Sequence, residues 1–258
     1  MFERLNITMR NRSAALLLTI DNRLHRILQL WLLLAGLVVA ARLAAAPRDL
    51  PVAGLSNTLS YGLLVLAPVA STLLALRWFA DGDRLPQPTT RLARVGRWQP
   101  VDLREAARHP LYGTSGIMVS LMVGMMLNVP VRAAEYLAAI PPLPIGAPHW
   151  LSALHLAMTF DVVLFGSLYM IAFVAALRRV PLFPRLLLAI WLGDLLMQLA
   201  TAQFVGNAGG LPPQVASALQ HMLDGNVKKA LISIVVWLPY LMLSTRVNVT
   251  YRNRIPVA

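Results

Sequence analysis

The sequence predicts an all-α polytopic membrane protein with six transmembrane helices and with both termini in the cytoplasm. Three observations predict this fold class. Apolar residues make up 57% of the 258 residues and charged residues only 13%, a composition whose apolar surface a soluble domain could not bury. Six apolar segments have the length of membrane spans, and arginine and lysine are concentrated on one side of them.

Each predicted span can cross about 30 Å of hydrocarbon at about 1.5 Å per helical residue. Helices are required, because hydrocarbon offers a free backbone no hydrogen-bond partner. The first span ends in AARLAAAP, which is similar to a signal-peptide cleavage site. Its apolar core of about 20 residues exceeds the usual 7–15, so we interpret it as a retained anchor. The segments are roughly 27–46, 58–78, 112–130, 151–177, 183–205 and 230–245.

The distribution of arginine and lysine predicts the orientation. With the N-terminus inside, 18 of these residues fall on the cytoplasmic side and five, namely Arg42, Arg48, Arg132, Lys228 and Lys229, on the other. Basic residues favour the cytoplasmic side of membrane proteins. This explanation also accounts for the net charge of +12, so nucleic acid is not an expected partner.

The chain is predicted to have three parts. Residues 1–80 form an N-terminal unit, in which SAALLLTIDNRLHR lies along the interface before two spans. Residues 81–110 form a basic cytoplasmic loop, in which VDLREAARH is a short helix opened by Asp102 and closed by Pro110. Residues 111–258 form a four-helix membrane domain. Five arginines of the loop are candidates for contact with the membrane surface or a partner: Arg91, Arg94, Arg97, Arg104 and Arg108.

Two outer loops are also expected to be ordered. Residues 131–150 are predicted to form a short amphipathic turn followed by a proline-rich approach to the next span. Residues 211–226 are predicted to form a short helix, because prolines precede it and glycine follows near its end. Such segments can cap a bundle or line an entrance to it.

No catalytic motif is complete. RHPLYG, residues 108–113, is similar to a run in membrane methyltransferases of the isoprenylcysteine carboxyl methyltransferase type, but the acidic pair that their cofactor site needs is absent downstream. The alternative is a basic membrane-entry turn in which Pro110 starts a helix. The chain has no cysteine, no nucleophile-elbow serine and no phosphate-binding glycine loop. We therefore expect no catalytic residues.

No metal site is predicted either. Met118, Met122, Met125 and Met126 lie at helical spacing, and thioethers can bind cuprous ion, but the same stripe is typical of helix packing. No two histidines have the i, i+4 spacing of a helical metal site. The sequence thus indicates neither a metal nor a cofactor.

Two carboxylates are predicted inside hydrocarbon spans, Asp161 and Asp194, and the other nine acidic residues are assigned to termini and loops. The two lie about 15 and 17 Å below the outer ends of consecutive spans, at similar depth. An aspartate at a helix centre costs about 2.5 to 3.5 kcal/mol on insertion scales, so both must face protein or water.

Three further residues are predicted to join these aspartates in a ligand- or proton-binding cluster. Gln198 and Thr201 follow Asp194 at i+4 and i+7, and His155 shares a face with Asp161. In the functional interpretation, the cluster carries a proton, a cation or a polar head group. In the structural interpretation, protonated acids and Gln198 only bond the two helices together. The sequence leaves both open.

The C-terminal stretch VVWLPYLMLSTRVNVTYRNR resembles the closing signature of the YdgK-like domain-of-unknown-function family. The resemblance covers about residues 112–254 and implies a four-helix inner-membrane module, to which this chain adds a two-helix N-terminal extension. It implies no established reaction. The matching positions are Trp237, Pro239, Tyr240, Ser244, Arg246, Val247 and Thr250.

Together these features favour a nonenzymatic protein of a bacterial-type inner membrane, acting as an accessory or scaffolding component. The alternative is a small transporter or ligand-binding protein that uses the Asp161 and Asp194 cluster. No convincing inverted repeat favours transport. The expected partners are membrane lipids and a protein within the membrane, with self-association as a further option.

Overall fold

The computed structural model describes residues 2–45, 54–89 and 96–257, and for residues 2–11 the backbone alone. Within these residues, six helices are long and apolar enough to cross a membrane, so the predicted all-α fold of a multi-pass membrane protein is confirmed. The long helices are α1 (Phe2–Ala44), α2 (Gly54–Trp78), α4 (Ile117–Ala139), α5 (His149–Leu177), α6 (Phe183–Gly206) and α7 (Pro213–Leu243).

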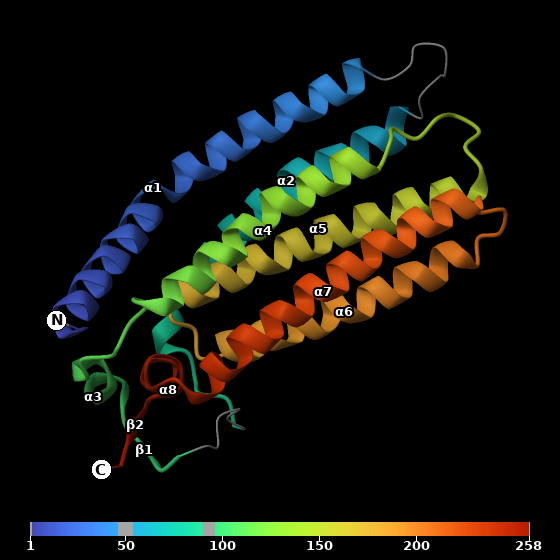
Figure 1. Ribbon diagram of the computed structural model, residues 1–258. Helices are drawn as coiled ribbons and strands as arrows, with labels where there is room; N and C mark the ends of the chain where they lie inside the picture. The colour runs from blue at the N-terminus through green and yellow to red at the C-terminus, as the bar shows by residue number, and fades with distance from the viewer. Residues whose placement is uncertain (1, 46–53, 90–95, 258) are drawn as a thin grey trace.

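The central helix of the bundle is α5. It packs against α2, α4 and α6, while α7 packs on α6 and α1 lies outside against α2 and α4 (Figure 1). Of the apolar stretch of α5, 61% is buried within the protein, against 11% for α1 and α7. These two outer helices therefore present most of their apolar surface to lipid.

The interior consists of two apolar clusters along the bundle. One contains Met118, Met122 and Met125 of α4, packed with Phe173 and other residues of α5. This packing agrees with the interpretation of the methionine stripe as a helix interface. The second cluster lies where the first part of α2, the last part of α4 and the first part of α5 meet. There Tyr61 of α2 packs edge to face on Tyr136 of α4, with ring centroids 6.3 Å apart.

Short elements cover the end of the bundle at which both termini lie (Figure 1). They are the 3-10 turn η1 (Gly82–Arg84), α3 (Leu103–Arg108), α8 (Thr245–Arg252) and the strands β1 (Trp98–Pro100) and β2 (Arg254–Pro256). The side chain of Asp102 accepts a hydrogen bond from the amide of Glu105, which confirms it as the cap that opens α3. The strands pair antiparallel, Gln99 opposite Ile255, and so join the 81–110 segment to the C-terminus.

Several predicted boundaries are wrong, most of them because a helix is longer than predicted. The segment 13–26 is continuous with the first span, α4 runs on to Ala139 instead of ending at 130, and 213–226 belongs to α7 instead of a separate helix. At its other end, α4 begins at Ile117 instead of 112, so Pro110 does not start this helix. Pro130 lies inside α4, since a proline in a membrane helix removes one hydrogen bond without ending the helix. As a result, Arg132 and Glu135 of α4, and Lys228 and Lys229 of α7, are not loop residues.

Candidate functional site

Asp161 and Asp194 face each other from neighbouring helices, α5 and α6. Each lies twelve residues, about 18 Å, from the end of its helix that is remote from the termini. Both carboxylates are buried. The side-chain amide of Gln198 donates to Asp161 Oδ1 at 3.1 Å and to Asp194 Oδ1 at 3.2 Å. The structure thus brings together these three residues of the predicted cluster.

Arg132 of α4 neutralises part of the negative charge of these two carboxylates. Its Nη1 donates to Asp161 Oδ2 at 2.8 Å, and its Nη2 makes an ion pair with Asp194 Oδ2. The side chain of Arg132 is only 13% exposed, and those of Asp161 and Asp194 are 7% and 4% exposed. These three residues form the buried charge cluster. Its two carboxylates and one guanidinium sum to a formal charge of −1.

Polar and aromatic side chains complete the surroundings of the buried charge cluster. Arg132 Nε donates to Asn128 Oδ1 at 3.0 Å, and the guanidinium carbon lies 5.1 Å from the ring centroid of Phe165. Tyr169 Oη donates to Asp194 at 3.4 Å. Asn226 of α7 donates to Gln198 Oε1 at 3.2 Å. Four helices of the bundle therefore contribute hydrogen bonds to this network.

Sequence reasoning missed Arg132, although a signal for it was present. Asn128, Arg132 and Glu135 follow one another at i, i+4 and i+7, the spacing that identified the stripe on the fifth span. The predicted third span ends at Pro130, which assigns Arg132 to an outer loop and so divides this stripe.

His155 and Thr201 lie outside the hydrogen bonds of the cluster. His155 is buried beside Tyr136, with 3.5 Å between its Nε2 and the phenolic oxygen, and Tyr136 in turn bonds to Thr159 at 2.8 Å. This polar group lies nearer the end of α5 at His149. Thr201 is buried one helical turn beyond Gln198.

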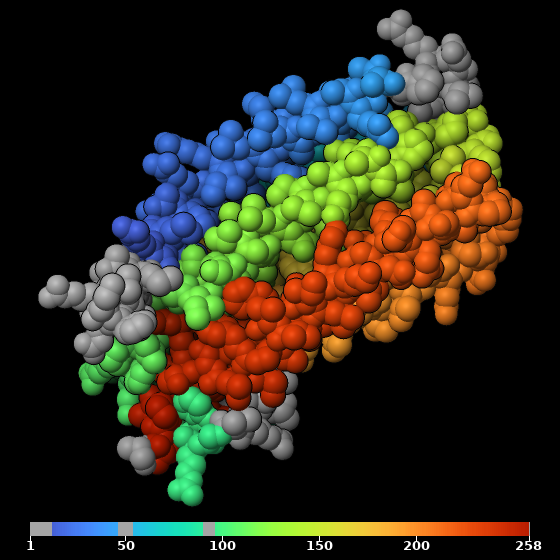
Figure 2. All heavy atoms as spheres, viewed as in Figure 1, coloured from blue at the N-terminus to red at the C-terminus, as the bar shows by residue number. Residues whose placement is uncertain are grey.

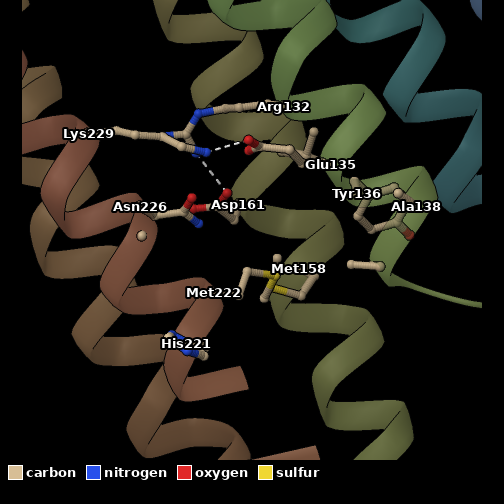
Figure 3. A pocket seen from close by; sticks show the side chains of 13 residues that line it. Arg132, Glu135, Tyr136, Ala138, Met158, Asp161, His221, Met222, Asn226 and Lys229 are labelled. Atoms are coloured by element: carbon tan, nitrogen blue, oxygen red, sulfur yellow. Dashed lines mark hydrogen bonds and ion pairs between the residues drawn. The ribbon is translucent and has the colours of Figure 1, made fainter. Parts of the chain in front are cut away.

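A cleft between α4 and α7, floored by α5, leads to the buried charge cluster. It holds a cavity of about 340 Å³, which is lined by Arg132, Asp161, Met158, Met222 and His221, among others (Figure 3). A second cavity of about 50 Å³ is lined by Arg132, Asp194 and Tyr169, among others. We call the two together the α4–α7 cleft, which is visible as a groove in Figure 2.

An ion pair crosses the α4–α7 cleft. Lys229 Nζ of α7 bonds Glu135 of α4, and both side chains are about half exposed. Both residues line both cavities, as do Arg132 and Asn226. The pair therefore stands between the larger cavity, on the side of His221, and the smaller one, on the side of Ser233. The larger cavity extends along α4 to Ala139 and along α7 to His221. It thus extends toward the end remote from the termini, which the distribution of basic residues predicts to be the outer side.

The basic loop and the RHPLYG run have other surroundings. Arg97, Arg104 and Arg108 are exposed at the end that carries the termini, and Arg91 and Arg94 lie outside the described residues. His109 Nδ1 accepts from the amide of Leu111 at 3.1 Å. The guanidinium of Arg179 lies 5.4 Å from the Tyr112 ring centroid. Burial raises the pKa of Tyr112, and the positive charge of Arg179 opposes this rise.

The residues of the C-terminal resemblance form the junction of α7 and α8. Pro239 lies inside α7, and the rings of Trp237 and Tyr240 pack edge to face at 6.1 Å. Ser244 separates the two helices. Arg246 Nη1 donates to Gly113 O at 3.1 Å and to Ser115 Oγ at 2.6 Å, so that α8 is tied to the segment that leads into α4.

Comparison with known proteins identifies no relative of this chain. No family model, no curated protein and no solved structure matches the chain, so the resemblance at the C-terminus stays a prediction. In the part of the chain that the structure describes, no three histidines, aspartates or glutamates gather in a way that could hold a metal ion.

Proposed function

We propose that the protein is a nonenzymatic ligand-binding or transport protein of a bacterial-type inner membrane, and that its α4–α7 cleft binds a small molecule with a positively charged head group. The observation that carries the proposal is the unbalanced buried charge cluster at the base of the cleft. Asp161, Asp194 and Arg132 sum to −1, and buried charge in a membrane core requires compensation.

A cationic head group would supply that compensation. The Nε, Nη1 and Nη2 atoms of Arg132 already donate to protein oxygens. The two oxygens of Asp161 accept from Arg132 and Gln198, and each has a second lone pair that can accept from a cationic ligand. The outer cavity of about 340 Å³ falls within the size range of small-molecule sites. Its apolar wall, including Met158 and Met222, suits an alkyl or aryl tail.

A proton is the natural competitor for the same carboxylates. Protonation of the cluster would remove the negative charge that attracts the ligand. Binding of a permanently charged or fully protonated cation is therefore expected to weaken when the cluster takes up a proton at low pH. Exchange of ligand for proton would then couple the cleft to a proton gradient.

The test compares two probes that share a tail, octylammonium and octanoate, with the full chain in nanodiscs. We expect octylammonium to bind more tightly at pH 8 than at pH 5, and octanoate to bind weakly at both. Asp161→Asn should reduce octylammonium affinity at pH 8 by about tenfold, which corresponds to about 1.4 kcal/mol. Equal binding of both probes, or binding that is unchanged in Asp161→Asn, contradicts the proposal. Flux of octylammonium in proteoliposomes then separates transport from binding.

Access to the cleft can be measured separately, because the chain has no cysteine. Met222→Cys, on the wall of the cavity, should react with a membrane-impermeant thiol reagent added from outside. Leu187→Cys, at a fully buried position of α6, is the matched control and should not react. Protection of Met222→Cys by octylammonium would support occupancy of the cleft, whereas labelling only from the cytoplasmic side would contradict the proposed access.

An accessory role in a membrane complex is the second candidate, and a specific observation favours it. Exposed arginines, Arg97, Arg104 and Arg108, lie on a folded layer that α3, α8 and the two strands build at one end of the bundle. Such a layer suits an acidic surface of a partner. Co-purification in mild detergent, compared with a variant in which all three arginines are glutamine, tests this role, and a partner retained equally by that variant argues against it.

A further inference from the structure

A separate cavity of about 720 Å³ lies at the end of the bundle that carries the termini. It is formed by the N-terminal part of α1, the start of α4 and the junction of α7 with α8. Ile117, which lines it, is fifteen residues from Arg132 on the same helix. That separation corresponds to about 22 Å along α4, so the cavity is distinct from the α4–α7 cleft.

Among the side chains that the structure describes, the charged lining of this cavity is entirely positive. Arg12 of α1 and Arg246 of α8 line it, and none of the described acidic residues does. The bonds from Arg246 Nη1 to Gly113 O and Ser115 Oγ fix this guanidinium at the wall. The opposite wall is fixed too, because Ser13 Oγ accepts from the amide of Gly116 at 2.8 Å and so holds α1 against the start of α4.

Hydroxyl groups and apolar side chains complete the lining. Ser120, Ser244, Thr245 and Tyr240 supply hydroxyl groups, and Leu111 and Val119 supply apolar surface. The apolar lining continues outward on Leu16 and Ile117, which are 45% and 63% exposed. Polar and cationic groups thus adjoin a lipid-facing apolar surface, an arrangement that suits an amphiphile with an anionic head.

The cavity also lies at the membrane depth of lipid head groups on the side rich in arginine. Ile117 begins α4, and Ser13, the neighbour of Arg12, accepts a hydrogen bond from the amide of Gly116 just before it. The excess of basic residues predicts that this end faces the cytoplasm, where the leaflet is rich in anionic lipids. Guanidinium groups pair with phosphate through parallel N–H donors. The charge of the cavity, its depth in the membrane and its shape therefore all favour the same kind of ligand, an amphiphile with an anionic head group.

We propose that this cavity is a binding site for an anionic phospholipid. The phosphodiester lies between Arg12 and Arg246, hydroxyls of the lining bond to the glycerol or head group, and an acyl chain follows Leu16 and Ile117 along the outside of the bundle. The bound lipid joins α1 to α4 and α7 at their cytoplasmic ends. The site does not depend on the proposed ligand of the α4–α7 cleft.

The test measures lipid binding by the delipidated full chain in detergent, by native mass spectrometry. The probes are phosphatidylglycerol and phosphatidylcholine with identical chains. We expect phosphatidylglycerol to bind at least about tenfold more tightly. Arg12→Gln and Arg246→Gln should each reduce phosphatidylglycerol affinity by about tenfold, and Arg12 is exposed on α1, so its substitution leaves the fold intact. Arg77→Gln, at an exposed arginine in the last turn of α2 that does not line the cavity, is the matched control and should bind as the natural chain does.

Four results would overturn the proposal. Equal affinity for the two phospholipids would remove the anionic selectivity, and an equal loss in Arg77→Gln would assign the effect to surface charge in general. Displacement of phosphatidylglycerol by inorganic phosphate at comparable concentration would indicate a free-anion site instead of a lipid site. A bulky substitution at the exposed Ser120, Ser120→Trp, fills the cavity without altering its charge and should also reduce phosphatidylglycerol binding, whereas unchanged binding would place the lipid elsewhere.

Discussion

The charge imbalance of the buried charge cluster makes a sharp prediction about the Asp161→Asn variant. One guanidinium faces two carboxylates, so an unliganded protein must take up a proton or a cation to balance the cluster. Asparagine at position 161 makes the cluster neutral and keeps an amide oxygen as acceptor for Arg132 Nη1. We therefore expect this loss of a charge to stabilise the protein.

The size of the expected stabilisation of Asp161→Asn follows from two opposing contributions to the free energy of unfolding. Placing a proton on an aspartate of ordinary pKa, about 3.9, costs about 4 kcal/mol at pH 7 and about 1.5 kcal/mol at pH 5. Exchanging a charge-assisted hydrogen bond for a neutral one loses about 1.5 kcal/mol. The net expectation for Asp161→Asn is a gain of about 2 to 3 kcal/mol in the free energy of unfolding at pH 7, and no gain at pH 5.

The sign of the pH dependence follows from proton counting. A folded chain that balances the cluster with a proton holds a proton that the unfolded chain has released. Because the folded state binds more protons, its stability falls as the pH rises. The natural chain is then expected to lose stability as the pH rises, by at most about 1.36 kcal/mol per pH unit, and Asp161→Asn should lose none through this group.

The matched comparison is the double variant Asp161→Asn with Asp194→Asn, which leaves Arg132 as an uncompensated buried cation. Removing the partners of a buried charge costs about 3 to 5 kcal/mol, and about 4 kcal/mol is also the attraction of unit charges 4 Å apart at an effective dielectric constant of 20. Adding Arg132→Met should recover most of this loss. The assay is unfolding of the protein in mixed micelles by increasing sodium dodecyl sulfate. A single variant as unstable as the double one would refute the charge-balance reasoning.

The other predictions concern the end of the bundle that carries the termini. A Cβ at Gly82 would lie 2.6 Å from the carbonyl oxygen of Arg178, so Gly82→Ala should lower the unfolding free energy by about 1 to 3 kcal/mol. Gly62→Ala is the control, because no atom lies within 4 Å of the new carbon in α2. This variant should instead raise the unfolding free energy by about 0.5 to 1 kcal/mol. Equal effects of the two substitutions would count against the steric argument. Asp102→Ala removes the cap of α3 and should cost about 0.5 to 2 kcal/mol, seen as faster amide exchange in residues 103–108 only. Asn253 has left-handed backbone angles, φ 46° and ψ 57°, so Asn253→Val should cost about 1 to 2 kcal/mol, while a neutral effect on the thermal midpoint would show that the turn relaxes freely.

Local chemistry made much of the fold predictable. Six spans follow from length and hydropathy, since each segment must satisfy its backbone within itself. The opening of α3 at Asp102 follows from the preference of an aspartate oxygen for an unpaired helical amide. The similar depth of Asp161 and Asp194 follows from helical rise along consecutive antiparallel spans. None of these features depends on which helices become neighbours.

Helix boundaries were less predictable, because local signals compete with tertiary contacts. Pro130 and Arg132 together indicate the end of a span, yet α4 continues through both. The helix can continue because the charge of Arg132 is met by carboxylates from α5 and α6. A residue that looks like an outer-loop arginine in the sequence thus becomes the centre of the buried charge cluster.

By itself, the sequence determined that two carboxylates lie within the membrane on consecutive helices, and that Gln198 and Thr201 share the stripe of Asp194. Only the tertiary structure decided that Arg132, which is 29 and 62 residues away from the two aspartates, pairs with both. It also decided that a cleft remains between α4 and α7. The physical reason is that periodicity fixes which face of a helix is polar, whereas the packing of side chains over the whole bundle fixes which faces meet.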